Sequence, residues 1–149
     1  IADRIDRLDD GRLVIVDYKT GNVSEKNWFT ERMADPQLPL YSVILKEPVA
    51  GILFARVKKG GFRYFGITDD EMIAPGVKGL AAAKKVITDC ESIEDVIEFW
   101  REKIETLAVE FKEGQAAVSP VSIHTSCRYC DIRPVCRIGE AIGDYENNQ

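Results

Sequence analysis

No apolar run in the chain approaches the roughly 20 residues that a membrane-spanning helix requires, and the start carries no signal-peptide pattern. The first absence excludes a transmembrane helix and any role that depends on one. The second leaves no sign of secretion, so the four cysteines are expected to be reduced thiols of a cytoplasmic protein. There is no internal repeat and no low-complexity segment. The chain begins on Ile1-Ala2-Asp3 without Met, inside a strand-like alternation, which indicates an excised fragment.

An excess of positive charge is also missing. Lys and Arg number 20 against 25 Asp and Glu, which gives a net charge of -5, whereas nucleic-acid-binding domains usually carry a basic face. Active-site carboxylates and a long acidic helix can hide a local basic patch, so the total charge excludes no class of partner. Apolar residues make up 45% and charged residues 30%, which excludes a disordered tail. The 149 residues are enough for one domain with a core and too few for two.

Two strands joined by a tight loop are predicted at the start of the chain. Residues 1–8 and 12–19 have the pattern of strands, and the second is rich in β-branched side chains. The intervening Asp9-Asp10-Gly11 suits a three-residue hairpin loop that ends in a residue with positive φ. That loop length sets a register in which Asp3 faces Asp17, and residues directly opposite share a face of the sheet.

The rest of the chain predicts a loop, a crossover helix and further strands. Residues 20–34 have no clear period, and a buried helix then begins with Asp35 as N-cap and Pro36 at its first position. The later elements are strands at 49–57 and 62–67, a short helix within 75–90, and a helix at 93–113 with a capping box at Ser92 and Asp95 and an apolar stripe from Ile93 to Phe111. A right-handed crossover makes the strands at 12–19 and 49–57 parallel. The pattern therefore predicts an α/β domain with a mixed sheet.

Three charged side chains of the hairpin carry the chemical prediction. In the expected register Lys19 lies on the same face as Asp3 and Asp17, and Asp6 lies on the other face. Opposed carboxylates repel each other unless a cation lies between them, and Mg²⁺ or Mn²⁺ accepts such oxygen ligands. Lys19 would orient a water or stabilise a phosphate oxygen, so the set indicates metal-assisted phosphodiester hydrolysis. The alternative is that both aspartates are surface charges, paired with nearby arginines or with Lys19.

The order of the motifs adds a family resemblance. The chain reads Asp3, then Val16-Asp17-Tyr18-Lys19-Thr20-Gly21, then Asp35-Pro36-Gln37-Leu38-Pro39-Leu40-Tyr41. This ordered set resembles the RecB/AddB-type nuclease domain of the PD-(D/E)XK superfamily. The resemblance implies that Asp3 and Asp17 are metal ligands, that the main-chain carbonyl of Tyr18 is a further ligand, and that Lys19 is the catalytic lysine.

The resemblance also implies a role for Gln37 and Tyr41, which form a helix motif that contacts DNA or supports the site. Gln37 heads an almost wholly apolar helix, where a polar group needs a partner. On the residues alone, Gln37 could instead be a partly exposed amide without a task, and Tyr41 could be a core residue.

Three cysteines lie close together near the end of the chain, at Cys127, Cys130 and Cys136. Thiolates at such spacing ligate either an iron–sulfur cluster or zinc. The resemblance implies a [4Fe–4S] cluster, since AddB-like nucleases carry one at this late position with a fourth cysteine well upstream of the nuclease motifs. Cys90 is expected to be structural, so the chain by itself is expected to hold no intact cluster.

The resemblance implies a restriction-endonuclease-like mixed sheet flanked by helices over residues 1–149, truncated at its N-terminal side, with a cysteine segment at about 124–137. The implied function is a Mg²⁺- or Mn²⁺-dependent DNA exonuclease in DNA repair and recombination, acting beside a helicase or helicase-like partner. The family's early helix, which often supplies a metal-binding histidine, has no counterpart, and His124 is expected to be a loop histidine. The isolated chain is therefore expected to cut DNA poorly. Two alternatives are a catalytically inactive module that holds DNA or a partner, and a zinc-stabilised structural domain.

Overall fold

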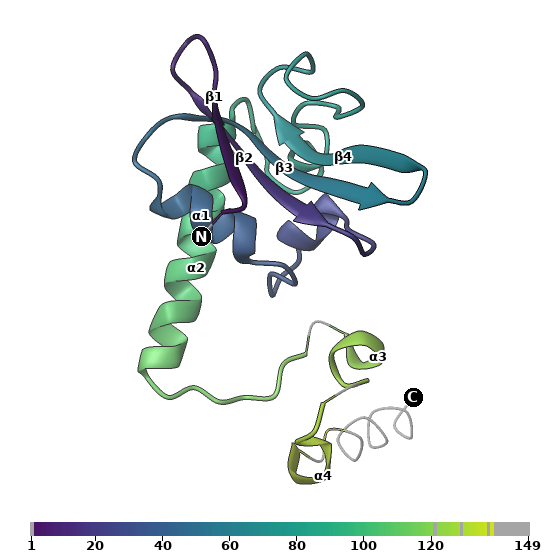
Figure 1. Ribbon diagram of the computed structural model, residues 1–149. Helices are drawn as coiled ribbons and strands as arrows, with labels where there is room; N and C mark the ends of the chain where they lie inside the picture. Colours follow the sequence, from purple (N-terminus) through teal and green to yellow (C-terminus); the bar gives the residue numbers. More distant parts are fainter. Residues whose placement is uncertain (1, 121, 129, 137, 139–149) are drawn as a thin grey trace.

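The computed structural model describes residues 2–120, 122–128, 130–136 and 138. Its strands are β1 (Arg4–Arg7), β2 (Leu13–Lys19), β3 (Val49–Lys58) and β4 (Gly61–Thr68). Its helices are α1 (Gln37–Ile44), α2 (Ile93–Lys112), α3 (Ile123–Ser126) and α4 (Arg133–Cys136), with 3₁₀ turns η1 (Glu25–Trp28) and η2 (Ala83–Lys85). The strands form one mixed sheet in the order β1-β2-β3-β4 (Figure 1). The predicted α/β class and mixed sheet are confirmed.

The predicted hairpin register is found wherever β1 and β2 pair. Ile5 lies opposite Ile15 and Asp6 lies opposite Val14, and Gly11 has the expected positive φ of 88°. The strand predicted for residues 1–8 is shorter than expected, because β1 begins only at Arg4. Asp3 therefore stands one residue before the paired strand.

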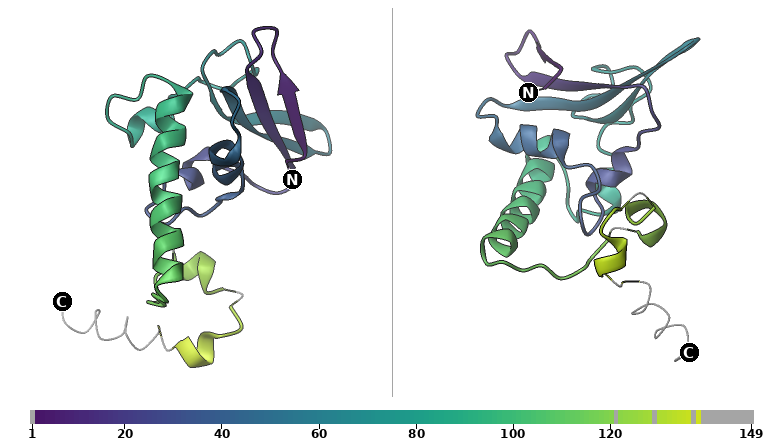
Figure 2. Two further views of the ribbon diagram at one scale, coloured as in Figure 1. Left: turned by 90° about the vertical axis from the view of Figure 1, so that its left-hand side faces the viewer. Right: turned by 60° about the horizontal axis from the view of Figure 1, so that its bottom comes forward.

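The crossover through α1 makes β2 and β3 parallel, as expected. Helices α1 and α2 lie together on one side of the sheet in both views of Figure 2. The main core lies between them and the sheet, and its largest buried side chains are Ile15, Trp28, Leu38, Ile52, Phe54, Ile67, Ile93, Val96 and Trp100. A smaller cluster on the opposite face joins Val14, Val16, Leu53 and Ala55 to Ala74 and Val77 of the segment after β4.

The segment predicted as a plain loop contributes a central core residue. Trp28, at the end of η1, is fully buried, with its ring 4.9 Å from that of Phe54 and 5.8 Å from that of Trp100. The Trp100 indole N–H donates to the Trp28 carbonyl at 3.2 Å. The 20–34 segment thus lies beneath the sheet, and it fixes the chain between β2 and α1.

The expected helix termini are only partly found. The capping box of α2 is present, since the Ser92 hydroxyl accepts from the Asp95 N–H and the Asp95 carboxylate accepts from the Ser92 N–H. The prediction for α1 was wrong by one residue: the helix begins at Gln37, and Pro36 is the N-cap without a side-chain cap. It is also less buried than expected, because Ile44 is 65% exposed. The stripe of α2 leaves the core before its end, where Phe111 is 87% exposed.

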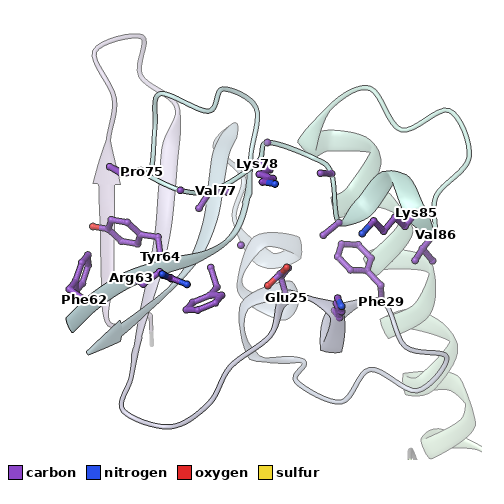
Figure 3. A pocket seen from close by; sticks show the side chains of 17 residues that line it. Glu25, Phe29, Phe62, Arg63, Tyr64, Pro75, Val77, Lys78, Lys85 and Val86 are labelled. Carbon is purple, nitrogen blue, oxygen red and sulfur yellow. The ribbon is translucent and has the colours of Figure 1, made fainter. Parts of the chain in front are cut away.

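The short helix predicted within 75–90 was wrong. Only the 3₁₀ turn η2 is helical there, because Gly76, Gly79 and Asp89 take positive φ values that interrupt a helix. This segment bends over the edge of β4 and leaves a pocket of about 970 Å³ between the two (Figure 3).

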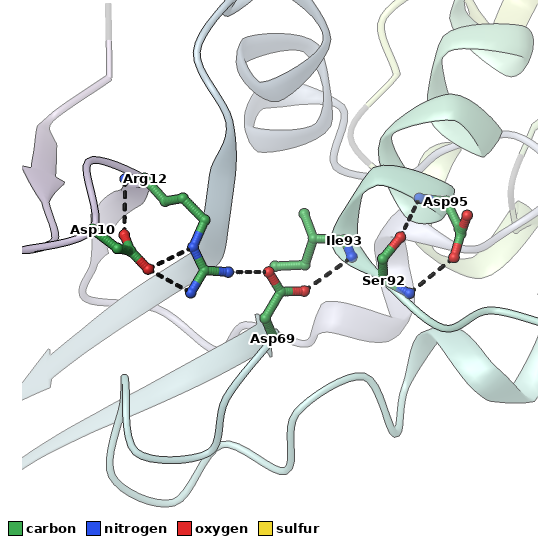
Figure 4. A network of polar contacts seen from close by, with 6 residues as sticks. All are labelled: Asp10, Arg12, Asp69, Ser92, Ile93 and Asp95. Carbon is green, nitrogen blue, oxygen red and sulfur yellow. Dashed lines mark hydrogen bonds and ion pairs between the residues drawn. The ribbon is translucent and has the colours of Figure 1, made fainter.

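A polar network ties the hairpin loop to the start of α2 (Figure 4). The Arg12 guanidinium donates to Asp10 at 2.8 Å and to Asp69 at 2.7 Å. The second oxygen of Asp69 accepts from the Ile93 N–H at 3.1 Å, in the first turn of α2. One carboxylate after β4 therefore positions both the β1–β2 loop and the long helix.

Candidate functional site

Asp17 is a buried carboxylate near the carboxyl end of β2. Its side chain lies on the same face as Ile15, toward the helices, and the residue is 1% exposed. A carboxylate in such a place is costly unless cations or hydrogen-bond donors compensate its charge. Asp17 is therefore not the surface charge of the alternative, although the pairing with Lys19 that the alternative named is present.

Two side chains compensate that charge and also contact each other. The Gln37 amide donates to Asp17 Oδ1 at 2.8 Å, and the Lys19 ammonium lies 2.7 Å from Asp17 Oδ2. The same ammonium donates to Gln37 Oε1 at 3.1 Å. We call these three residues the Asp17–Lys19–Gln37 triangle. Gln37 is the first residue of α1, and the sequence predicted that its amide needs a polar partner. Asp17 and Lys19 of β2 are those partners.

The Oδ2 atom of Asp17 is the least satisfied part of the triangle. It is buried, and no hydrogen-bond donor among the described residues is well aligned with it, although the Lys19 ammonium is close enough for an ion pair. A buried carboxylate oxygen with lone-pair capacity to spare is a candidate ligand for a cation.

Lys19 is held in its charged form. The Asp17 carboxylate, 2.7 Å away, raises the pKa of Lys19 and outweighs the opposing effect of burial, and Asp3 adds a smaller attraction. The lysine side chain is 30% exposed, so its ammonium can meet a solvent-borne anion. Lys19 is therefore a fixed positive charge at the edge of the site.

Asp3 lies beside the triangle through a backbone contact. It is exposed, and its Oδ2 accepts from the Tyr18 N–H at 2.9 Å. The exposed Tyr18 side chain lies on the opposite face, where its hydroxyl accepts from Arg4 at 3.3 Å. Arg4 forms its ion pair with Asp6 at 2.8 Å.

Tyr41 lies one turn after Gln37 on α1. It is half-buried against the main core and its hydroxyl contacts the Gln37 side chain. Tyr41 therefore packs against the core, as one alternative predicted, and it also contacts a residue of the triangle.

The oxygen atoms at this end of β2 suit a hard divalent cation. Asp17 and Asp3 carry carboxylates, and Tyr18, whose N–H donates to Asp3, has a backbone carbonyl. The described residues contain no group of three or more His, Cys, Asp or Glu side chains placed to hold a metal. Mg²⁺ requires fewer, because it commonly binds through one or two carboxylates with waters and substrate phosphates completing its shell. The donor set therefore fits Mg²⁺ or Mn²⁺ better than a cation that needs a full protein cage.

The three late cysteines lie on and between the short helices near the end of the chain. Cys127 follows α3 and is buried, Cys136 ends α4, and Cys130 lies between the two short helices, which follow α2 in the chain and lie near its carboxyl-terminal end (Figures 1 and 2). All are free thiols and belong to no metal-binding group in the described part of the chain. His124, expected in a loop, lies instead within α3. Cys90 is buried beside the start of α2, and burial raises the pKa of its thiol.

Two basic residues that the sequence reasoning did not select lie in line with Lys19. Lys19 pairs with Arg56 of β3, and Arg56 pairs with Arg63 of β4, so the three side chains share one face of the sheet. The signal was present in the sequence, because the predicted turn between 49–57 and 62–67 places Arg56 opposite Arg63. We call Lys19, Arg56 and Arg63 the basic row.

Comparisons with known proteins complete the description. No helix in the described residues is long and apolar enough to cross a membrane. No curated protein and no solved structure matches the chain. The sequence does match the PD-(D/E)XK nuclease superfamily over residues 1–137, which is most of its length. The chain belongs to the PD-(D/E)XK nuclease superfamily.

Proposed function

We propose that the protein is a metal-dependent DNA exonuclease of the RecB/AddB type, which hydrolyses phosphodiester bonds during DNA repair and recombination. The observation that carries the proposal is the Asp17–Lys19–Gln37 triangle, in which a buried carboxylate lies 2.7 Å from an ammonium group. Structural ion pairs are usually exposed and contribute little. A buried carboxylate whose second oxygen lacks an aligned hydrogen-bond donor is better explained as a ligand for a metal ion.

The proposed metal ligands are Asp17, Asp3 and the main-chain carbonyl of Tyr18. They are hard oxygen donors, in keeping with the divalent metals that nucleases of this superfamily typically use. When bound, Mg²⁺ or Mn²⁺ activates a water and neutralises charge on the scissile phosphate.

The chain's own side chains have separate tasks in this proposal. Lys19 stabilises negative charge that develops on a phosphate oxygen, and its raised pKa keeps it protonated for that purpose. Gln37 fixes the positions of Asp17 and Lys19, because its amide donates to one and accepts from the other. Tyr41, beside Gln37, supports the helix end that carries the amide.

The proposed partners are a DNA end and a helicase or helicase-like subunit. The superfamily membership supports a nucleic-acid substrate, and the ordered RecB/AddB-like motifs support DNA and the helicase association. Exposed arginines and lysines near the site would contact the phosphate backbone without reading sequence.

Metal binding offers a direct test. Asp17→Asn in the native protein should weaken Mn²⁺ binding by about tenfold or more, because it removes a carboxylate ligand and keeps the shape of the side chain. Asp6→Asn is the matched control, since Asp6 lies on the other face of the same hairpin in an ion pair with Arg4. Calorimetric titration with Mn²⁺ gives both affinities. Equal Mn²⁺ affinity in the two variants would remove Asp17 from the metal site.

The main rival is a nuclease fold without chemistry that only holds DNA or a partner. Such a module gains nothing from a buried acid, and replacing Asp17 by Asn would leave its binding unchanged. The rival therefore predicts no difference between Asp17→Asn and wild type in any metal-dependent assay.

We further propose that Cys127, Cys130 and Cys136 ligate an iron–sulfur cluster together with a cysteine outside this set. The proposal rests on their spacing and on the AddB-like position of the segment, because the described residues do not gather them into a site. Cys90 is a poor fourth ligand, since its buried thiol has a raised pKa and contacts the Ser92 carbonyl at 3.8 Å.

Cysteine variants separate this proposal from the zinc alternative. In native protein purified without oxygen, Cys136→Ser should lose iron and sulfide together, whereas Cys90→Ser should retain both. Iron, sulfide and zinc analysis gives the result. Stoichiometric zinc without sulfide would favour a structural zinc domain, and loss of iron from Cys90→Ser would contradict the ligand assignment.

A further inference from the structure

The pocket of about 970 Å³ beside β4 has no part in the catalytic proposal. Its walls are the edge of β4, residues 75–86 and the first residues of η1 (Figure 3). β4 is the last strand of the sheet, so the backbone groups along its outer edge are not used in strand pairing. The pocket therefore combines side chains from both faces of β4 with backbone groups that no neighbouring strand of the described sheet uses.

Aromatic rings stand on the β4 side of the pocket. Phe62 is 54% exposed, with its ring centre 4.8 Å from that of Tyr64 in an edge-to-face pair. Phe65 lies on the other face of the strand beneath the Arg56 guanidinium, at 4.8 Å. Phe62 is the exposed ring of the three, because Tyr64 is half-buried against the second core cluster and Phe65 lies under Arg56. An exposed ring is a surface on which unpaired bases stack, whatever their sequence.

Positive charge gathers around the same pocket. Its charged lining residues are Lys26, Arg63, Lys78 and Lys85 against the single acid Glu25. Figure 3 shows Arg63, Lys78 and Lys85 on three different walls of the pocket. This concentration stands out in a chain whose net charge is -5. It provides the local basic patch that the total charge conceals.

The basic row joins the pocket to the triangle. Lys19 belongs to the triangle, Arg63 lines the pocket, and Arg56 lies between them on the same face. Adjacent strands are about 4.8 Å apart, so the row spans roughly 10 Å across the sheet. A phosphate backbone lying along the basic row would meet one positive charge on each of β2, β3 and β4.

We infer that this pocket binds unpaired nucleotides of the DNA strand whose phosphate lies at Lys19. The strand follows the basic row on one face of the sheet and passes over the free edge of β4, where bases stack on Phe62 on the other face and the surrounding lysines and Arg63 contact the phosphates. The inference rests on the proposed function, because that function places a phosphate of the strand at Lys19. It adds a second binding site, separate from the metal ligands. The occupant is single-stranded, because bases in a duplex have no free face to offer Phe62. An acidic peptide would use the lysines but not the rings.

Binding of fluorescent oligothymidine in EDTA tests the inference without any cutting. The double variant Lys78→Ala/Lys85→Ala should bind about tenfold more weakly at low salt. The negative slope of log affinity against log salt should become shallower by about 1.4, because two phosphate contacts are lost. The control Lys46→Ala/Lys112→Ala makes the same charge change at exposed positions outside the pocket and should bind like wild type.

A second pair of variants tests the stacking. Phe62→Ala should lose about tenfold in affinity for oligothymidine, and its control Phe111→Ala, which removes an 87% exposed ring at the end of α2, should lose none. Equal affinity of pocket and control variants would overturn the inference, and so would an equal loss for a blunt duplex. Asp17→Asn should keep the pocket-dependent binding. If the protein binds through the pocket but never cuts, the proposed function fails and this inference stands.

Discussion

Lys19→Ala in the native protein is expected to lower the rate of DNA cutting by about a hundredfold to a thousandfold, with DNA affinity changed much less. Lys19 has an ammonium that Asp17 and Gln37 hold at 2.7 and 3.1 Å, so it is oriented before substrate arrives. A preoriented charge stabilises the transition state without reorganisation, whereas its share of ground-state binding is one contact among many. Single-turnover cutting of end-labelled DNA, with binding measured in EDTA, separates the two effects.

Lys58→Ala is the matched control for Lys19→Ala. Its ammonium also contacts an amide oxygen, that of Asn22 at 2.9 Å, near the same end of the sheet. Among the described residues Lys58 has no carboxylate partner comparable to Asp17, so its loss should affect binding slightly and the cutting step hardly at all. Undiminished cutting by Lys19→Ala, or an equal loss in both variants, would remove Lys19 from the proposed catalytic role.

Gly66→Ala is expected to destabilise the fold by about 3 kcal/mol or more. Gly66 has φ of 153°, and a Cβ built there would lie 2.1 Å from the Ile52 carbonyl oxygen on the neighbouring strand. That oxygen belongs to the backbone of β3 and cannot turn aside, so the β3–β4 pairing must open. Urea unfolding followed by circular dichroism measures the change in free energy.

Gly61→Ala is the control, because Gly61 opens the same strand, has no positive φ and has nothing within 4 Å of an added Cβ. It should change the free energy of unfolding by a few tenths of a kcal/mol, which is ordinary for an exposed site. If both variants unfold at the same urea concentration, the close approach of β3 and β4 at Gly66 is not a constraint on the fold.

The sheet could be predicted from the sequence because its signals are local. Alternation of side chains, a three-residue loop and one crossover helix determine the register of β1 with β2 and the parallel pairing of β2 with β3. The capping box of α2 is equally local, since Ser92 and Asp95 need only each other. Such features depend on a few neighbouring residues, and tertiary packing did not override them.

The segments that were predicted wrongly depend on contacts between residues far apart in the sequence. Trp28 lies in a segment without period, and its burial follows from rings of β3 and α2 that no local pattern reveals. Residues 75–90 are rich in alanine, yet they follow the edge of β4 in a series of turns. The end of α2 carries the apolar stripe of a buried helix, but no sheet extends far enough to cover Phe111.

The sequence predicted which residues form the candidate site, but it predicted only some of the contacts between them. Strand alternation placed Asp17 and Lys19 on one face, and an unpartnered amide at the head of an apolar helix indicated that Gln37 needed a contact. That Gln37 bridges both residues depends on how α1 docks against β2, which a sequence pattern does not specify. The contact of Asp3 with the Tyr18 N–H was not predicted either, because the pairing of β1 begins only at Arg4, one residue after Asp3.

The most direct test of the central claim is release of nucleotides from a labelled DNA end by the native protein, with and without Mg²⁺ or Mn²⁺. We expect cutting that requires the metal, persists in Asp6→Asn and falls at least about a thousandfold in Asp17→Asn. Cutting that continues in EDTA, or that Asp17→Asn performs at the rate of wild type, would contradict the assignment of the Asp17–Lys19–Gln37 triangle as a metal-dependent nuclease centre.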